Sequence, residues 1–301
     1  MKDIGGYVIQ TQHFSVNDGN GIRSTIFLAG CPLHCQWCAN PEGLTCQPKI
    51  GYLESKCTSC GICAPICPLH LDININQNNA RLSCTSCGAC ADVCPNHAKI
   101  KLVEYKSTDK IIEEIKRQIV FFRYSGGGVT FSGGEATMQE AFLRELVTRL
   151  EDLGISITLE TCAYFDYDKV ADILCSLDML FVDIKVMDDI KHKHFTGVSN
   201  QLILENIKKF AELPIPIVVR IPTIIGVNAD DENIIATSNF VHENLPNARI
   251  ELLPYHSLAS YKYESLGMRK PSTDFKNPSF EEILRLRLLI ESYGVETVEW
   301  K

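Results

Sequence analysis

The sequence predicts an α/β fold in which strands and helices alternate along the chain and one small cysteine-rich domain interrupts them. From about residue 108 to residue 293, short β-branched apolar runs alternate with longer stretches whose apolar residues recur at helical spacing. Between residues 50 and 100 this alternation stops, and cysteines at short, repeated spacings take its place. A length of 301 residues suits one large domain together with a small one.

Composition and charge narrow the classes of protein to consider. Hydrophobic residues make up 45% of the chain, which supports a substantial core, and the net charge of −8 argues against nucleic acid and anionic membranes as partners. Residues 1–15 contain no apolar signal-peptide core, and no apolar run reaches membrane-spanning length. Fourteen cysteines in a chain without an export signal favour metal or cluster ligation over disulfides. We therefore expect a reducing cytoplasm, in an anaerobic setting because exposed clusters are sensitive to oxygen.

The first strand of the alternating series is expected at residues 24–28, a β-branched apolar run. An apolar segment at 7–9 and a polar, glycine-rich loop at 17–23 precede it. A three-cysteine motif at 31–38 follows it directly. The motif is therefore expected on the loop at the carboxyl end of the strand, which is where α/β folds place their chemistry.

Five more strands and six helices are expected beyond the cysteine-rich segment. The strands are expected at 129–131, 155–159, 179–184, 217–221 and 249–253. The helices are expected at 108–124, at 143–150 before Gly154, and at 166–176, 201–212, 230–244 and 279–293. Because five of the connections are long enough for right-handed crossovers, we expect a parallel sheet curled into a partial (β/α)6 TIM-like barrel. Residues 1–49 and 101–301 would form this barrel, with residues 50–100 as an inserted domain.

The inserted segment contains the run C-x2-C-x2-C-x3-C-P twice, and the two copies begin 27 residues apart, at positions 57 and 84. This repeat is the pattern of bacterial two-cluster ferredoxins, in which the fourth cysteine of each run ligates the other 4Fe–4S cluster. One cluster would take Cys57, Cys60, Cys63 and Cys94, and the other would take Cys84, Cys87, Cys90 and Cys67. A pair of zinc sites is the alternative, but zinc does not require these spacings or the final proline. We therefore expect a ferredoxin-like domain with two 4Fe–4S clusters.

The earlier cysteines, Cys31, Cys35 and Cys38, number only three. A 4Fe–4S cluster has four irons, so three protein ligands leave one iron free to bind a substrate or cofactor. The eight cysteines of the insertion already form two complete sets, so none is left for this position. With Trp37 before its last cysteine, the motif resembles the CxxxCxxC cluster motif of the radical S-adenosylmethionine (radical SAM) superfamily. A structural metal knuckle is the alternative, but it does not explain the position directly after the first strand.

Further motifs of that superfamily are expected at later strand ends. Gly133, Gly134 and Glu135 resemble its GGE motif. The glycines would let the backbone approach a ligand, and the carboxylate would accept hydrogen bonds from the methionine ammonium. By the same resemblance, acids and a hydroxyl at the next two strand ends would line the cofactor site and would hold a monovalent cation near the methionine carboxylate. These residues are Glu160, Thr161 and Asp183.

Basic side chains are expected at the same edge of the sheet. By resemblance, Lys185 and Arg220 would neutralise the methionine carboxylate or contact the ribose, and His256 would contact the cofactor. Each site residue also has a simpler interpretation. The glycines would then form an ordinary turn with a solvated glutamate, the charged residues would be salt-bridged groups at the barrel rim, and the histidine would be structural. The remaining cysteines receive no role; they are Cys46, Cys162 and Cys175.

The chain as a whole resembles the glycyl-radical-enzyme activating enzymes, the group that includes pyruvate formate-lyase activase. The resemblance covers nearly the whole length and rests on residues 15–23, 30–42, 132–136, 183–187, 196–200 and 252–256. The insertion resembles that of the extended members, which activate glycyl radical dehydratases, decarboxylases and lyases. Two departures lie in one loop, where Asn17 replaces the usual histidine and Asn20 the usual proline. Asp18 is retained there as the candidate contact to the partner peptide.

This resemblance implies an oxidoreductase with three 4Fe–4S clusters that cleaves S-adenosylmethionine reductively. The resulting 5′-deoxyadenosyl radical would take a hydrogen atom from a glycine Cα of a partner glycyl radical enzyme. The two inserted clusters would relay electrons from ferredoxin or flavodoxin. Two alternatives stay open. One is a radical SAM enzyme acting on another small molecule or peptide, and the other is a multi-cluster electron carrier that leaves S-adenosylmethionine intact.

Overall fold

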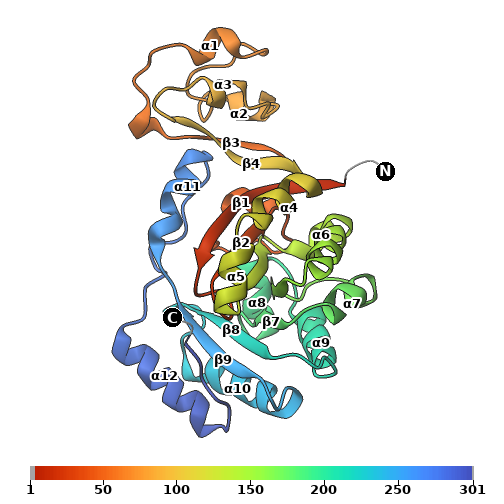
Figure 1. Cartoon of the computed structure of the whole chain (residues 1–301). Helices are drawn as coiled ribbons and strands as arrows, with labels where there is room; N and C mark the ends of the chain where they lie inside the picture. The colour runs from red at the N-terminus through yellow and green to blue at the C-terminus, as the bar shows by residue number, and fades with distance from the viewer. Residues whose placement is uncertain (1–3, 300–301) are drawn as a thin grey trace.

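The computed structural model describes residues 4–299, in which nine strands form one sheet in the order β3-β4-β1-β2-β5-β6-β7-β8-β9. Six strands run parallel, as the sequence predicted: β2 (Arg23–Leu28), β5 (Gly128–Gly133), β6 (Ser156–Thr161), β7 (Met179–Asp183), β8 (Ile217–Thr223) and β9 (Arg249–Pro254). Figure 1 shows this curved sheet at the centre of the main body, with helices around its outside. The prediction of an α/β fold with a mostly parallel sheet is therefore confirmed.

Three strands at one edge of the sheet were not part of the predicted series. β1 (Gly5–Ser15) pairs antiparallel with β2 and with β4 (Lys99–Ser107), and β3 (Lys49–Tyr52) pairs antiparallel with β4. The sequence indicated only an apolar segment at 7–9. The second half of β1 alternates exposed and half-buried side chains that are polar except for Phe14, so it contains no continuous apolar run.

Helices lie between and after the parallel strands. They are α4 (Thr108–Lys116), α5 (Ile119–Ser125), α6 (Glu140–Asp152), α7 (Tyr167–Cys175), α8 (Asp189–Thr196), α9 (Gln201–Phe210), α10 (Asp231–Asn244), α11 (Ser260–Ser265) and α12 (Phe280–Ser292). Five of the six predicted helices are confirmed, with small shifts at their ends. The sequence did not predict α8 or α11, which are short and mostly polar.

The predicted single helix at 108–124 is two helices, α4 and α5, so this prediction was wrong at residues 117–118. The N–H of Gln118 donates to the carbonyl of Ile115, which tightens the end of α4 into an i→i+3 turn. α4 buries three isoleucines, whereas α5 buries only Phe122. The apolar spacing continues across the break, but the two segments pack differently, and spacing alone cannot reveal such a change.

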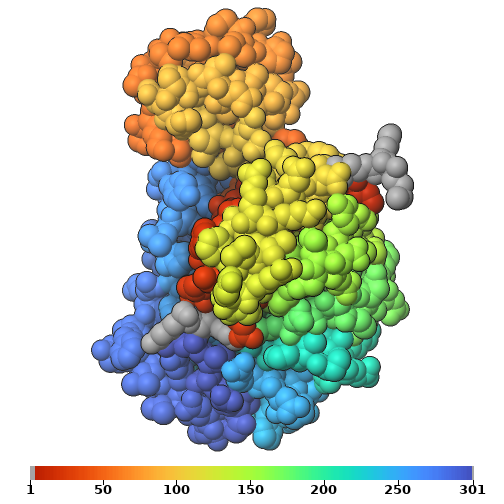
Figure 2. All heavy atoms as spheres, viewed as in Figure 1, coloured from red at the N-terminus to blue at the C-terminus, as the bar shows by residue number. Residues whose placement is uncertain are grey.

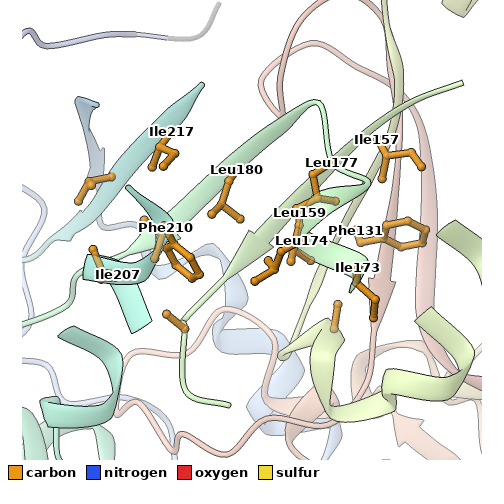
Figure 3. Packing of buried hydrophobic residues seen from close by; sticks show 14 of the residues in the cluster. Phe131, Ile157, Leu159, Ile173, Leu174, Leu177, Leu180, Ile207, Phe210 and Ile217 are labelled. Carbon is orange, nitrogen blue, oxygen red and sulfur yellow. The ribbon is translucent and has the colours of Figure 1, made fainter. Parts of the chain in front are cut away.

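The main core lies between the sheet and the helices on its outer face. Figure 3 shows Phe131 of β5, Leu159 of β6 and Leu180 of β7 in one layer with Ile173 of α7 and Phe210 of α9. Each of these side chains is at most 1% exposed. Burial of such a side chain contributes roughly 1.5–3 kcal/mol. This layer therefore fixes the strands whose carboxyl ends carry the polar motifs.

Replacing Phe210 with alanine is expected to lower the free energy of unfolding by roughly 3–5 kcal/mol, because a fully buried ring is lost and a cavity remains. Anaerobic urea unfolding measures this change. Leu82→Ala is the control, because this side chain is 85% exposed and its loss should change stability by less than about 0.5 kcal/mol. Equal stability of the two variants would contradict the place of Phe210 in the core.

The chain between β3 and β4 forms a lobe that extends away from the sheet. It contains α1 (Cys63–Ile66), α2 (Ala80–Ser83) and α3 (Ala89–Asp92). Figures 1 and 2 show this lobe, in orange and gold, above the main body and joined to it by the β3–β4 pair. Within residues 4–299, no helix has the length and apolar character needed to cross a membrane.

Candidate active site at the carboxyl ends of the strands

A cavity of about 260 Å³ opens where the six parallel strands end. Its wall includes Cys31, Cys35 and Cys38 after β2, Gly133 and Gly134 around the end of β5, Cys162 after β6, Asp183 and Lys185 around the end of β7, Pro222 in β8, and Pro254, Tyr255 and His256 around the end of β9. This convergence follows from the topology, because the carboxyl ends of parallel strands lie at one edge of a sheet.

The loop 31–38 is held in place by the segment at the end of α8. Two backbone N–H groups of the loop donate to the carbonyls of Phe195 and Thr196, at 3.0 and 2.8 Å. The buried ring of Trp37 lies against that of Phe195, with centroids 6.0 Å apart. This support fixes the backbone that presents the three thiols to the cavity.

The three thiols differ in their electrostatic surroundings. Burial raises the pKa of Cys35 to about 12 and that of Cys38 to about 11. A hydrogen bond with the thiol of Cys162 lowers the pKa of Cys31, although burial acts against this. Cys31 is therefore the most readily ionised of the three. A cationic iron centre would have to displace the protons of the other two on binding.

The donor set fits an iron–sulfur cluster. Cys31, Cys35 and Cys38 all border one cavity, and cysteine thiolates are the ligands that such clusters use. Among residues 4–299, no three His, Cys, Asp or Glu side chains approach closely enough to hold a single metal ion. Cys31, Cys35 and Cys38 therefore do not converge on a single point, and they border the cavity instead.

Lys185 places a fixed positive charge in the cavity wall. Its Nζ lies 2.8 Å from Oδ2 of Asp183. Burial would lower the pKa of Lys185, but the Asp183 carboxylate and the Cys35 thiol raise it above its ordinary value. The amine therefore stays protonated at neutral pH. Together the pair offers a cation and a carboxylate, which can bind the two charged ends of an amino-acid group.

Glu135 lies behind the cavity wall. Its carboxylate is 0% exposed and accepts hydrogen bonds from Thr137 Oγ1 at 2.8 Å, from Thr161 Oγ1 at 2.8 Å and from the N–H of Cys162 at 2.7 Å. The sequence-based interpretation instead placed this carboxylate against a methionine ammonium. In the structure its acceptor positions are occupied by its own chain, so it joins the turn after β5 to the end of β6.

Gly133 and Gly134 do line the cavity, and close backbone packing explains why glycine is needed there. Gly133 has φ +119°, and a Cβ at this residue would lie 2.3 Å from the carbonyl oxygen of Leu28. A Cβ on Gly134 would lie 2.2 Å from the carbonyl oxygen of Gly30. The turn after β5 therefore packs directly on the turn that leads into the cysteine loop.

Glu160 and Arg220 form an ion pair between β6 and β8, outside the cavity wall. The guanidinium also donates to the Glu251 carboxylate at 2.7 Å and to the carbonyl of Asn17 at 2.8 Å. It stacks 3.7 Å from the ring centroid of Phe181. Burial raises the pKa of Glu160, and Arg220 opposes that shift. The N–H groups of Arg220 are thus engaged by other groups of the protein, whereas the sequence-based expectation was a contact with the ligand.

The structure therefore divides the predicted cofactor residues into two groups. Five line the cavity with the three cysteines: Gly133, Gly134, Asp183, Lys185 and His256. Four lie outside its wall: Glu135, Glu160, Thr161 and Arg220. Sequence reasoning did not assign a role to Cys162, whose thiol contacts that of Cys31. The one feature of the sequence that pointed to Cys162 was its position directly after Thr161, the last residue of β6.

Asp18 lies in the loop that precedes β2, whereas the three cysteines follow that strand. Its carboxylate accepts hydrogen bonds from Ser15 Oγ at 2.5 Å and from Thr25 Oγ1 at 2.6 Å, and its carbonyl accepts one from Thr130 Oγ1 at 2.7 Å. Thr25 and Thr130 are the third residues of β2 and β5, so Asp18 lies beside the middle of these two strands. The loop is connected to the interior through Arg220, which reaches the carbonyl of Asn17.

The eight cysteines of the lobe gather around two small pockets. One is bordered by Cys57, Cys60, Cys63 and Cys94, and the other by Cys67, Cys84, Cys87 and Cys90. These are the two sets that the ferredoxin pattern assigns. We call them the distal pocket and the proximal pocket, because α1, which begins at Cys63, lies farthest from the main body in Figure 1.

Comparison with known proteins reveals the family context of this geometry. Residues 25–237 match the model of the Radical SAM superfamily. The chain is 40% identical over 296 residues to the trans-4-hydroxy-L-proline dehydratase activating enzyme of Clostridioides difficile, with 96% of this chain and 97% of the relative covered. It is 38% identical over 296 residues to the (2S)-3-sulfopropanediol sulfolyase activating enzyme of Bilophila wadsworthia, with the same coverage.

A solved structure supports the fold independently of close sequence similarity. A radical SAM methyltransferase from Sphaerobacter thermophilus aligns with a TM-score of 0.53 at 12% identity, over 97% of this chain and 76% of that one. At this identity the likeness concerns the fold alone.

Proposed function

The chain belongs to the radical SAM superfamily and, within it, to the activating enzymes of glycyl radical enzymes, and we propose that it activates such an enzyme by cleaving S-adenosylmethionine reductively. The observation that carries this proposal is the shared cavity, where three thiols meet the Asp183–Lys185 pair and the glycine turn after β5. The chain has both the cluster ligands and a binding place for an amino-acid group in one space.

Each part of the cavity has a proposed task. Cys31, Cys35 and Cys38 would hold a 4Fe–4S cluster. Asp183 and Lys185 would bind the charged methionine end of S-adenosylmethionine. A cluster bound here would supply the one electron that cleaves the sulfonium of S-adenosylmethionine into methionine and a 5′-deoxyadenosyl group able to take a hydrogen atom from the partner's glycine Cα. The protein contributes orientation and exclusion of water.

Residues behind the wall would position this site. Glu135 and Thr161 tie the turn after β5 to β6, and the Glu160–Arg220 pair joins β6 to β8. Arg220 also reaches the loop after β1, which supports a sheet curled into a partial β/α barrel. Asp18, held by its own neighbours in that loop, is proposed to contact the partner peptide.

The expected monovalent cation is not part of the proposed site. Two of the three residues expected to hold it, Glu160 and Thr161, lie outside the cavity wall and already have partners in the protein. Glu160 is paired with Arg220, and the Thr161 hydroxyl donates to Glu135. A cation beside Glu160 would have to compete with the Arg220 guanidinium.

The lobe is proposed to be a ferredoxin-like domain, residues 50–100, with one 4Fe–4S cluster in each pocket. Its support is the grouping of the eight cysteines into two sets of four. With the first site this makes three clusters. Ferredoxin or flavodoxin is the proposed electron donor, and a reducing cytoplasm is the proposed location, because free thiols and such clusters require one.

A direct experiment tests the function. The protein, reconstituted anaerobically with iron and sulfide, is incubated with S-adenosylmethionine, a reductant and a candidate glycyl radical dehydratase, decarboxylase or lyase. We expect 5′-deoxyadenosine together with the electron paramagnetic resonance signal of a glycyl radical on the partner. Cleavage without that signal on any candidate would favour a different substrate. No cleavage at all would favour a simple electron carrier.

The relay role of the lobe gives a further prediction. The double variant Cys57→Ala/Cys84→Ala removes one ligand from each pocket and should slow activation at least about tenfold when reduced ferredoxin or flavodoxin is the donor. The time course of glycyl radical formation measures this. Cys175→Ala is the control, since that cysteine is exposed on α7 and borders neither pocket. Unchanged rates in the double variant would exclude a relay.

A further inference from the structure

The short helix α11 contacts the cysteine loop on one side. The hydroxyl of Tyr263 donates to the carbonyl of Cys38 at 2.8 Å, and Nζ of Lys262 lies 2.6 Å from the Glu42 carboxylate and 2.9 Å from Oδ1 of Asn40. Tyr263 and Glu42 are both buried. Asn40 itself lines the cavity and donates its backbone N–H to the Cys38 sulfur at 3.3 Å. α11 thus supports the backbone around one thiol of the active site.

The other end of α11 contacts the lobe. Arg81 in α2 donates to the carbonyl of Ser265 at 2.9 Å and to the carbonyl of Ile50 in β3 at 2.8 Å. Asn76 donates to the carbonyl of Glu264 at 3.0 Å and accepts a hydrogen bond from Nε of Arg81 at 2.9 Å. Figure 1 shows α11 directly beneath the lobe, beside β3, and in Figure 2 this blue segment meets the orange lobe.

These two sets of contacts connect one particular pocket of the lobe with the active site. α2 ends just before Cys84, whose N–H donates to the carbonyl of Arg81 at 3.3 Å. Cys84 belongs to the proximal pocket. A path of covalent bonds and hydrogen bonds therefore leads from Cys84 to Cys38. It passes through Arg81 in α2 and then through Ser265 and Tyr263 in α11. Within residues 4–299, no hydrogen bond joins the residues of the distal pocket to α11, and α1 lies on the far side of the lobe.

We propose that α11 is a tie that sets the position of the proximal pocket relative to the three-cysteine loop, with Arg81 and Tyr263 as its two anchoring residues. For electron delivery this rests on the proposed function. A low-potential protein donor is oxidised by one electron. That electron then reaches S-adenosylmethionine by way of the clusters proposed in the distal pocket and in the proximal pocket, in that order. Arg81 and Tyr263 are positioning residues. They act by fixing a separation on which the rate of electron transfer depends steeply.

Two variants test the tie by hydrogen–deuterium exchange on the whole protein. Arg81→Ala should speed amide exchange in α2 about tenfold, because a half-buried charged donor to two carbonyls is lost. Tyr263→Phe keeps the ring and removes only the hydroxyl, and should speed exchange in residues 36–40 by a similar factor. Leu82→Ala and Tyr261→Phe are the matched controls, since both side chains are exposed neighbours on the same helices.

A kinetic comparison tests the consequence. Arg81→Ala should form 5′-deoxyadenosine several-fold more slowly than the parent with reduced ferredoxin, yet at the same rate with dithionite, which can reduce the active site directly. Equal slowing with both reductants would mean that Arg81 supports only folding, and no slowing with either would mean that the tie does not affect delivery. Unchanged exchange in both variants would overturn the tie itself. If the parent forms no 5′-deoxyadenosine with either reductant, the proposed function fails, whereas the exchange measurements still test the tie.

Discussion

Cys35→Ala is expected to abolish 5′-deoxyadenosine formation. Cys35 is one of three thiols that border the cavity, and the loop has no fourth cysteine to replace it. Losing a partner that merely orients a metal ligand costs roughly 10–100-fold in affinity or activity, so losing one of only three ligands should cost more. The reconstituted variant should hold fewer irons per chain and lack the spectroscopic signal of the active-site cluster, while the lobe keeps its own.

The control for this experiment is Cys175→Ala, which removes an exposed thiol from α7 and should leave iron content and cleavage unchanged. Cys162→Ala adds information, because that thiol contacts Cys31 and lines the cavity without belonging to the three-cysteine motif. If Cys35→Ala still cleaved S-adenosylmethionine while Cys162→Ala did not, the assignment of the three ligands would be wrong.

Glu135→Ala is expected to have the second largest effect, through the fold around the site. The buried carboxylate accepts hydrogen bonds from Thr137, Thr161 and the N–H of Cys162, and alanine would leave these donors without an acceptor. One unsatisfied buried donor costs about 1–3 kcal/mol, so the free energy of unfolding should fall by at least about 3 kcal/mol. Anaerobic urea unfolding measures the loss, and iron content reports the accompanying disorder of the turn beside the cysteine loop.

Glu113→Ala serves as the matched control, because this glutamate is exposed on α4 and its loss should change stability by less than about 0.5 kcal/mol. The same pair of variants separates the two interpretations of Glu135. If Glu135→Ala kept full stability but bound S-adenosylmethionine more weakly, the carboxylate would contact the ligand directly, as the motif alone suggested. A loss of stability without ligand present supports the proposed positioning role.

Much of the fold was accessible from the sequence because its elements are marked locally. Each parallel strand contains a short apolar run with at least one β-branched residue, and each of the five confirmed helices repeats its apolar residues at helical spacing. The errors fall where local pattern and packing disagree. The break between α4 and α5 lies inside an uninterrupted apolar spacing, and the second half of β1 pairs with β2 although its residues other than Phe14 are polar.

The sequence alone determined where the chemistry-bearing residues stand along the chain: three cysteines after the first parallel strand, a glycine pair after the second, and two sets of four cysteines in the lobe. Only the tertiary structure decided which way those side chains turn. Glu135 and Arg220 carry the right charges for a ligand, yet their partners come from their own chain. The tie through α11 joins Tyr263 to Cys38 across 225 positions and Arg81 to Ser265 across 184. Hydrogen-bond partners and burial depend on which distant segments meet, and spacing along the chain carries no information about that.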